Sequence, residues 1–488
     1  MKFLKYLDIR RFERTNRYYF LFNLVLGLGT LIFFVLTRDT PMQQSFINML
    51  FDQAIEWRTG LGKFGSECDA EIAAKDVVIL SFKDSDMESW RYPTMTPRNK
   101  IADMIRFAYE GGASIVVLDM ELSEPDYSPA NKLFGDSKVM TGQERDKELF
   151  DLLEQIKNDT ASNTRVLISG DIHANKMLKD NDFAKLIDNK KIFAASTYVS
   201  ASRGNDSMVR FWQPYVEITA EYDDVQAREV LWSFQMMSLA LTEGGEEELE
   251  RISQNILYGD DEIFTMHCKS GRDFVLYREM ESKSGLIFRN TQSLQYNRIQ
   301  YVFTPFTLQK SIRNIAESNV GNWANHDYLD VTNKIVLIGR EDKECNDIIA
   351  TPIGRMPGLY VHGNAIATIL GKTQPHISSI WKYLVIEIIL IIITAYVFVY
   401  RKYAGAKRIV SVMTFLCLGG TYFYFLLTNE FVYLTCAFAG IGVYNFVNRM
   451  EEFFKKGYSA KSYLKKILSY FKKLLGRKSD REPVNLKK

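Results

Sequence analysis

Cysteine is scarce in this chain of 488 residues. Only five cysteines occur, and Cys417 and Cys436 lie inside long apolar segments. The other three are Cys68, Cys268 and Cys345, which allow at most one internal disulfide. The sequence does not say whether any two of them pair. A small domain held together by a disulfide framework is excluded, because such domains carry many more cysteines per residue.

The signatures of common catalytic sites are also missing. The five histidines are scattered, without the spacing of a metal site. No serine or cysteine lies in a nucleophile elbow, and Gly371-Lys372-Thr373 is no phosphate loop, because Ile366 stands where the first glycine is required. Gly170-Asp171-Ile172-His173 is similar to one piece of the metallophosphatase pattern, whose other pieces fail. We predict a protein that is not an enzyme and has no cofactor. Of the functions considered below, a periplasmic hydrolase is the least favoured.

The net charge of +2 conceals a segregation of charge along the chain. Residues 38–381 carry 37 basic and 51 acidic side chains, whereas residues 1–37 carry 6 and 2 and residues 382–488 carry 18 and 6. An acidic middle between basic ends is typical of a membrane protein with a large domain on one side.

Four apolar segments are candidates to cross the membrane: residues 18–37, 383–400, 409–427 and 431–447. Basic segments mark the cytoplasmic side. The predicted organisation is therefore a basic cytoplasmic N-terminus (1–17), one transmembrane helix (18–37), an extracytoplasmic domain (38–381), three transmembrane helices (382–448) and a basic cytoplasmic tail (449–488). A retained anchor is favoured over a cleaved signal peptide, because no clear cleavage site follows the first segment.

The tail from Arg449 carries 13 basic and 4 acidic residues around an apolar stripe. This pattern favours a helix lying on an anionic inner leaflet. The residues expected at the membrane surface are Lys465, Lys466, Phe471, Lys472 and Lys473. A helix that binds a partner and a merely solvated tail are the alternatives.

The acidic middle is built around a strand–helix–strand unit. Residues 76–82 and 114–118 are short apolar runs typical of buried strands, and the helix between them begins after Thr96-Pro97. Further buried strands are predicted at 166–169, 192–197 and 334–339, with an antiparallel strand at 208–219 and helices at 41–58, 143–157, 225–242 and 359–370. The fold class is an α/β domain with a mostly parallel sheet. Residues 243–310 give no clear pattern.

Acidic residues follow several of these strands, where open α/β sheets place ligands. The candidate ligand-binding residues at this rim are Asp84, Arg98, Asp119, Glu121, Glu124, Asp347 and His362. The helices that begin at Arg98 and Leu359 would open on the same rim, and helix N-termini favour an anion.

Two other interpretations of the rim remain open. Asp119 and Glu121 are candidates to hold a calcium or magnesium ion, since both metals take oxygen ligands. In the other interpretation the acids are solvated, and Arg98 and Asp119 form a structural ion pair that fixes the turns between strands and helices.

Several of these segments resemble the class 2 CHASE extracellular sensory domain of bacteria. They are Asp76–Asp126, the Asp206–Arg210 element and a C-terminal signature of Lys334–Gly339, Asp347, Thr351-Pro352, Met356-Pro357-Gly358, His362 and Asn364. The signature adds Asn364 to the candidate site residues. Lys83 departs from the family, which usually has an acid there.

The resemblance implies a sensory input domain of a multi-pass protein in the bacterial inner membrane, with the large domain on the periplasmic side. The 40 residues after the last span are too few for a cytoplasmic enzyme domain. We therefore expect an unknown small ligand and a protein partner or homo-oligomer, besides the lipid bilayer, and no nucleic acid. The alternative function is a scaffold subunit of a cell-envelope complex. The identity of the ligand and the oligomeric state cannot be derived from the sequence.

Overall fold

The computed structural model describes residues 14–37, 41–61, 72–91, 95–122, 124–133, 136–170, 182–201, 208–222, 225–259, 261, 263–277, 299, 301, 330–342, 347–371, 376–400 and 403–432. The chain divides into two compact units, which are described separately. The folded unit comprises residues 39–378 and 422–431, and the helical unit comprises residues 1–38, 379–421 and 432–488.

Five parallel strands form the central sheet of the folded unit. Their order across the sheet is β1 (Val77–Phe82), β11 (Ile335–Arg340), β2 (Ile115–Asp119), β3 (Arg165–Ser169) and β4 (Ile192–Ala195). The prediction of an α/β domain with a mostly parallel sheet is confirmed. Of these five strands, β11 comes last along the chain but lies between β1 and β2 in the sheet. Leu337 therefore pairs with Ile79 on one side and Val117 on the other.

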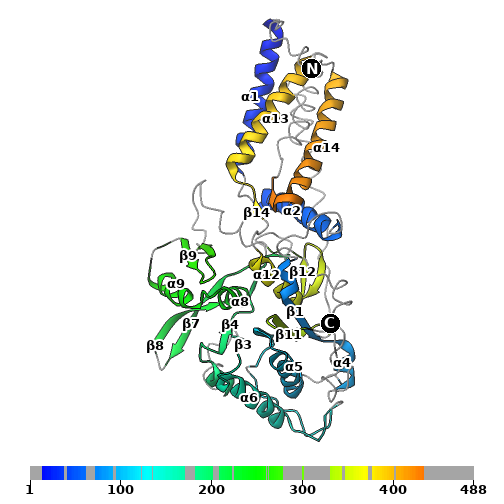
Figure 1. Cartoon of the computed structure of the whole chain (residues 1–488). Helices are drawn as coiled ribbons and strands as arrows, with labels where there is room; N and C mark the ends of the chain where they lie inside the picture. Colours follow the sequence, from blue (N-terminus) through cyan, green and yellow to red (C-terminus); the bar gives the residue numbers. More distant parts are fainter. Residues whose placement is uncertain are drawn as a thin grey trace, which may run out of the picture. The chain divides into compact units, whose positions relative to one another are not determined.

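Helices cover both faces of this sheet (Figure 1). They are α4 (Asp84–Ser89), α5 (Arg98–Glu110), α6 (Gly142–Asn158), α8 (Phe234–Glu243) and α12 (Gly358–Leu370), with short 3-10 turns at Ala74–Asp76 and Asp182–Leu186. On one face, Ile105 of α5 and Leu153 of α6 pack into a core cluster with Leu118 of β2. α12 contacts β1 and β11 and packs against α8, which contacts β2. Since strand side chains alternate between faces, Asp119 belongs to the face opposite Leu118, the face of α12.

Smaller antiparallel elements complete the folded unit. They are the pairs β5 (Val199–Ala201) with β6 (Val209–Trp212), β7 (Tyr215–Tyr222) with β8 (Val225–Trp232), β9 (Ile263–His267) with β10 (Asp273–Tyr277), and β12 (Ile348–Thr351) with β13 (Gly354–Pro357), together with α9 (Glu246–Tyr258). The predicted helix at 225–242 is wrong in its first half, which is strand β8. Ser233 separates strand from helix, because its side-chain oxygen accepts a hydrogen bond from the backbone N–H of Met236 and caps α8.

Helix α2 (Pro41–Leu61) also belongs to the folded unit. The ring of Phe51 stacks on Phe431 at 4.9 Å and meets the edge of Phe425 at 5.3 Å. Phe431 belongs to β15 (Glu430–Phe431), which pairs in parallel with β14 (His376–Ile377). The segment after residue 421 therefore packs with α2 as part of this unit.

A buried ion pair fixes α2 further. Arg210 of β6 is 2 % exposed and its Nη2 lies 2.7 Å from the Oδ2 atom of Asp52, while its Nε donates to both carboxylate oxygens. Arg58 of α2 donates to the backbone carbonyl of Phe425 and to the side-chain oxygen of Asn429. These bonds join three segments that lie far apart in the sequence.

The helical unit contains α1 (Arg14–Leu36), α13 (Ile380–Tyr400) and most of α14 (Tyr403–Thr428). α1 packs on α13, where a side chain at Gly27 would come within 2.5 Å of Ile391, so the glycine permits the close approach. Within the described residues, two segments are long and apolar enough to cross a membrane, Trp381–Val399 and Arg408–Thr428.

The four predicted spans therefore have two counterparts of sufficient length. In α1 the apolar stretch is shorter, Asn23–Leu36. The fourth segment begins with Phe431 in a strand, and its residues 433–447 lie outside the described part of the chain. The proposed membrane-surface residues of the tail also lie outside it, as do Cys68, Cys345 and Cys436. Cys268 is buried as a free thiol.

Candidate functional site

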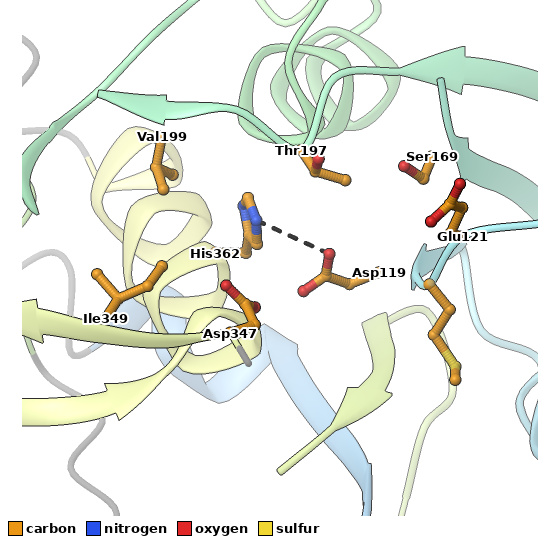
Figure 2. A pocket seen from close by; sticks show the side chains of 9 residues that line it. Asp119, Glu121, Ser169, Thr197, Val199, Asp347, Ile349 and His362 are labelled. Atoms are coloured by element: carbon orange, nitrogen blue, oxygen red, sulfur yellow. Dashed lines mark ion pairs between the residues drawn. The ribbon is translucent and has the colours of Figure 1, made fainter. Parts of the chain in front are cut away.

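A cavity of about 350 Å³ opens at the carboxyl ends of the parallel strands (Figure 2). Its lining combines residues that follow β2, β3, β4 and β11. The described residues that line it are Asp119, Met120, Glu121, Ser169, Thr197, Val199, Asp347, Ile349 and His362. In parallel sheets these strand ends lie on one edge, so residues up to 243 positions apart in the chain meet there.

Asp119 is the most enclosed acid of the cavity. It is the last residue of β2, and its side chain is 12 % exposed. Desolvation raises the pKa of its carboxyl to about 7, because burial penalises the charged form. Among the described residues, its ion-pair partner is Nε2 of His362, at 3.9 Å from Oδ1, which is too far for a direct hydrogen bond.

His362 lies one turn inside α12 and is 3 % exposed. Its Nδ1 is 2.9 Å from the side-chain nitrogen of Gln235 in α8, and the ring of Phe234 packs edge-on against the imidazole. Desolvation lowers the pKa of His362 to about 4, against the opposing charge of Asp347 and a backbone hydrogen bond at Thr197. The imidazole is therefore neutral at pH 7.

Asp347 reaches the cavity from the segment between β11 and β12. Its carboxylate lies over the N-terminus of α12, where a Cβ on Gly358 would come within 1.9 Å of Oδ2. Desolvation and then the charge of Asp119 raise the pKa of Asp347 to about 6, while His362 and the Gly358 backbone N–H lower it. Glycine at the start of α12 leaves room for this carboxylate.

The rest of the lining is divided between polar and apolar groups. Glu121 is exposed beside the cavity, and Ser169 and Thr197 bring hydroxyl groups from the ends of β3 and β4. Val199, Ile349 and Met120 supply apolar surface. Figure 2 shows Asp119, Asp347 and His362 together in the middle of this arrangement, with Glu121 and Ser169 to one side.

Arg98, a candidate from the sequence, is not among the described residues that line this cavity. It is 2 % exposed, with its Nε 3.4 Å from Oδ1 of Asp146, and it donates to the backbone carbonyls of Glu121 (2.9 Å) and Glu124 (3.1 Å). The alternative interpretation, a structural ion pair between Arg98 and Asp119, does not occur, because Arg98 begins α5 on the opposite face of the sheet and pairs with Asp146. Arg98 instead holds the segment after β2 in place.

Three further candidates are also not among the described lining residues. Asp84 begins α4 after β1, the edge strand, and β11 separates that strand from β2. Glu124 is exposed, and its backbone carbonyl accepts the bond from Arg98. Asn364 is fully buried and donates to the carbonyl of Tyr360 one turn back along α12. Lys83, the residue that departs from the family pattern, is not among the described lining residues either. Its Nζ lies 3.9 Å from Oε1 of Glu341.

The metal hypothesis gains no support from the geometry. Among the described residues, no group of three or more histidine, cysteine, aspartate or glutamate side chains is arranged to hold a metal ion. The three acids and the histidine surround a cavity that an organic molecule could occupy.

A known family matches the chain. A family model described as the CHASE2 domain matches residues 28–399, most of the chain. The chain belongs to the CHASE2 domain family. CHASE2 is an extracellular sensory domain family, so the resemblance found in the sequence is confirmed. No curated protein and no solved structure matches the chain.

Sequence reasoning missed part of this CHASE2 cavity. Ser169 ends one predicted strand and Thr197 ends another, so the carboxyl-end rule could have identified both. Gln235 lies in α8, the correctly predicted half of the helix expected at 225–242, and no sequence pattern indicates that its side chain meets His362. It is fully buried against His362, and its side-chain oxygen has no hydrogen-bond partner among the described residues.

Proposed function

We propose that this CHASE2 protein is a membrane-anchored extracytoplasmic receptor that binds a small ligand in the cavity around Asp119, Asp347 and His362 and acts through a protein partner. The observation that carries the proposal is the cavity itself. Ligand sites are concave, mainly apolar and fitted with a few convergent polar groups of perturbed pKa. The cavity combines apolar surface with such groups, and it lies where α/β sheets bind ligands.

Anchoring is supported by the two apolar segments of α13 and α14 and by the charge pattern of the chain. Basic residues 401–408 lie between these segments, and the acidic residues concentrate in 38–381. By the positive-inside rule, this pattern supports an orientation with the CHASE2 domain outside the cytoplasm. The sensory class of the family supports a ligand-induced change that is passed on, and a protein partner is our proposal for its recipient.

The proposal is tested by thermal unfolding of the full-length protein in detergent with a library of metabolites. A ligand stabilises the folded state by mass action, by about 2.7 kcal/mol at one hundred times its Kd. The variant Val199→Phe fills the cavity and should abolish the shift. The matched control is Tyr198→Phe, because Tyr198 is the exposed neighbour outside the lining.

The alternative, a scaffold subunit of a cell-envelope complex, predicts a different result in the same assay. A scaffold needs no small molecule, so no compound should change the melting temperature, and Val199→Phe should leave complex assembly intact. If a compound stabilises the wild type and Tyr198→Phe but not Val199→Phe, the scaffold hypothesis is rejected.

A further inference from the structure

We infer that the ligand of this cavity is a small organic cation, a protonated amine, bound between the carboxylates of Asp119 and Asp347 with its apolar body against Val199 and Ile349. The inference rests on the proposed function and names the chemical class of ligand that the site selects. Four features of the cavity lead to this class: the sign of its charge, the state of the nearby helix N-terminus, its poor match to a metal and its apolar wall.

The charge of the lining is negative. It contains three carboxyl groups and one imidazole, and none of its described members is a lysine or arginine. Arg98 cannot compensate, because its guanidinium is engaged with Asp146 and two backbone carbonyls. The imidazole of His362 contributes no charge, since desolvation lowers its pKa to about 4. An anionic ligand would therefore be repelled.

The N-terminus of α12 does not reverse this preference. Free backbone N–H groups at a helix start attract anions, as the sequence led us to expect here. In the structure the carboxylate of Asp347 already lies against Gly358, the first residue of α12, and the Asp347 backbone oxygen accepts the Gly358 N–H at 2.9 Å. The protein's own acid thus fills the position that a ligand anion would take.

A metal ion is a poor match for the same charges. Calcium and magnesium need six or more oxygen ligands, and the described residues provide no suitable cluster. An ammonium group needs only two or three acceptors, which Asp119, Asp347 and the hydroxyl of Thr197 can supply. Val199, Ile349 and Met120 provide an apolar wall that a hydrated metal would leave unused but that an alkyl or aryl body would cover.

Ionisation makes the binding dependent on pH. The titratable groups that face the cavity are Asp119, Glu121, Asp347 and His362, with Asp119 at a pKa of about 7 and Asp347 at about 6. A bound ammonium ion stabilises the ionised form of both carboxyl groups and lowers their pKa values. Binding therefore releases protons. Affinity should therefore fall as the pH drops below about 7, by up to tenfold per pH unit for each carboxyl involved. Anion binding would show the opposite trend.

The test uses the full-length protein and molecules of equal shape but different charge. Phenethylamine, 2-phenylethanol and 3-phenylpropanoate share one aromatic body, and hexylamine, hexanol and heptanoate share one alkyl body. Binding is measured by calorimetry and thermal shift at pH 8 and pH 5.5. We expect the amine of at least one series to bind at least tenfold more tightly than its neutral and anionic matches, with the preference lost at pH 5.5.

Two variants locate the effect. Asp119→Asn and Asp347→Asn should each weaken amine binding at least tenfold at pH 8. Asp151→Asn, which removes an exposed carboxylate of α6 outside the cavity, should leave it unchanged. Equal loss in all three variants would show non-specific attraction to an acidic protein and would overturn the inference.

The remaining outcomes separate this inference from the proposed function. If the anionic or neutral matches bind better, or if no amine binds while another library compound stabilises the protein, the charge class is wrong and the receptor function stands. If no compound of any class stabilises the protein, both fail.

Discussion

Replacing Asp119 by asparagine distinguishes a binding site from a structural ion pair. The substitution keeps the shape of the side chain and removes its charge. A structural pair would lose about 3–5 kcal/mol when one buried partner is removed. The structure predicts the opposite sign, because Asp119 is enclosed without a cation within hydrogen-bonding distance among the described residues, 3.9 Å from a neutral imidazole.

The magnitude follows from the pKa. Desolvation raises the pKa of Asp119 from 3.8 to about 7, and each unit corresponds to about 1.36 kcal/mol, so the ionised carboxylate costs up to about 4 kcal/mol of stability at pH 8. Because the pKa of this carboxyl is higher in the folded state, Asp119 costs the folded domain little stability below pH 3.8. Stability is then lost as the pH rises towards 7 and the buried carboxyl ionises. Asp119→Asn should therefore stabilise the domain by up to about 4 kcal/mol at pH 8 and by less than about 1 kcal/mol at pH 4.

The assay compares thermal melts of wild type and Asp119→Asn in detergent across this pH range, with Asp151→Asn as the control for general charge effects. For a domain of this size, the stabilisation amounts to a rise in Tm on the order of 5 °C at pH 8. A fall in Tm of several degrees at pH 8 would refute the reasoning, since it would mean that the carboxylate is paired in the folded state. A rise that does not depend on pH would refute the assigned role of ionisation.

Three further predictions concern other parts of the chain. Arg98→Met should lower the stability by about 3–5 kcal/mol in a denaturant melt, because it leaves Asp146 without its ion-pair partner and two carbonyls without their donor, and an unchanged midpoint would contradict the role assigned to it. Gly358→Ala should displace the Asp347 carboxylate, cost about 1–3 kcal/mol of stability and reduce ligand binding, whereas wild-type binding would contradict the placement over α12. In spheroplasts of a chain whose own cysteines are replaced, an impermeant thiol reagent should label Tyr258→Cys and spare Ala406→Cys, and the reverse pattern would invert the orientation.

The sequence predicts the central sheet well because its strands are buried on both faces. Continuous apolar runs such as Val77–Leu80 and Ile115–Leu118 are too short for typical helices and rich in β-branched residues, and Thr96-Pro97 marks the start of the helix between them. The strand β8 is harder to recognise because Val225–Trp232 and Phe234–Glu243 form one long stretch, in which only Ser233 marks the boundary between strand and helix.

The candidate site was harder to predict because position along the sheet edge depends on strand order. Asp119, Glu121, Asp347 and His362 meet because β11 lies directly beside β2, whereas Asp84 follows the edge strand. The sequence contains no signal for that order. It also cannot say that α5 and α12 lie on opposite faces, so it suggests Asp119 rather than Asp146 as the partner of Arg98.

The segment 422–431 has a practical consequence for work with the isolated CHASE2 domain. A soluble fragment that stops at residue 378 would omit Tyr422, Phe425 and Phe431, although these residues pack on Trp57 and Phe51 of α2. It would also leave the edge of β14 unpaired and Arg58 without the acceptors on Phe425 and Asn429. A fragment that joins residues 41–378 to residues 422–431 through a flexible linker would keep the residues that make these contacts in one chain.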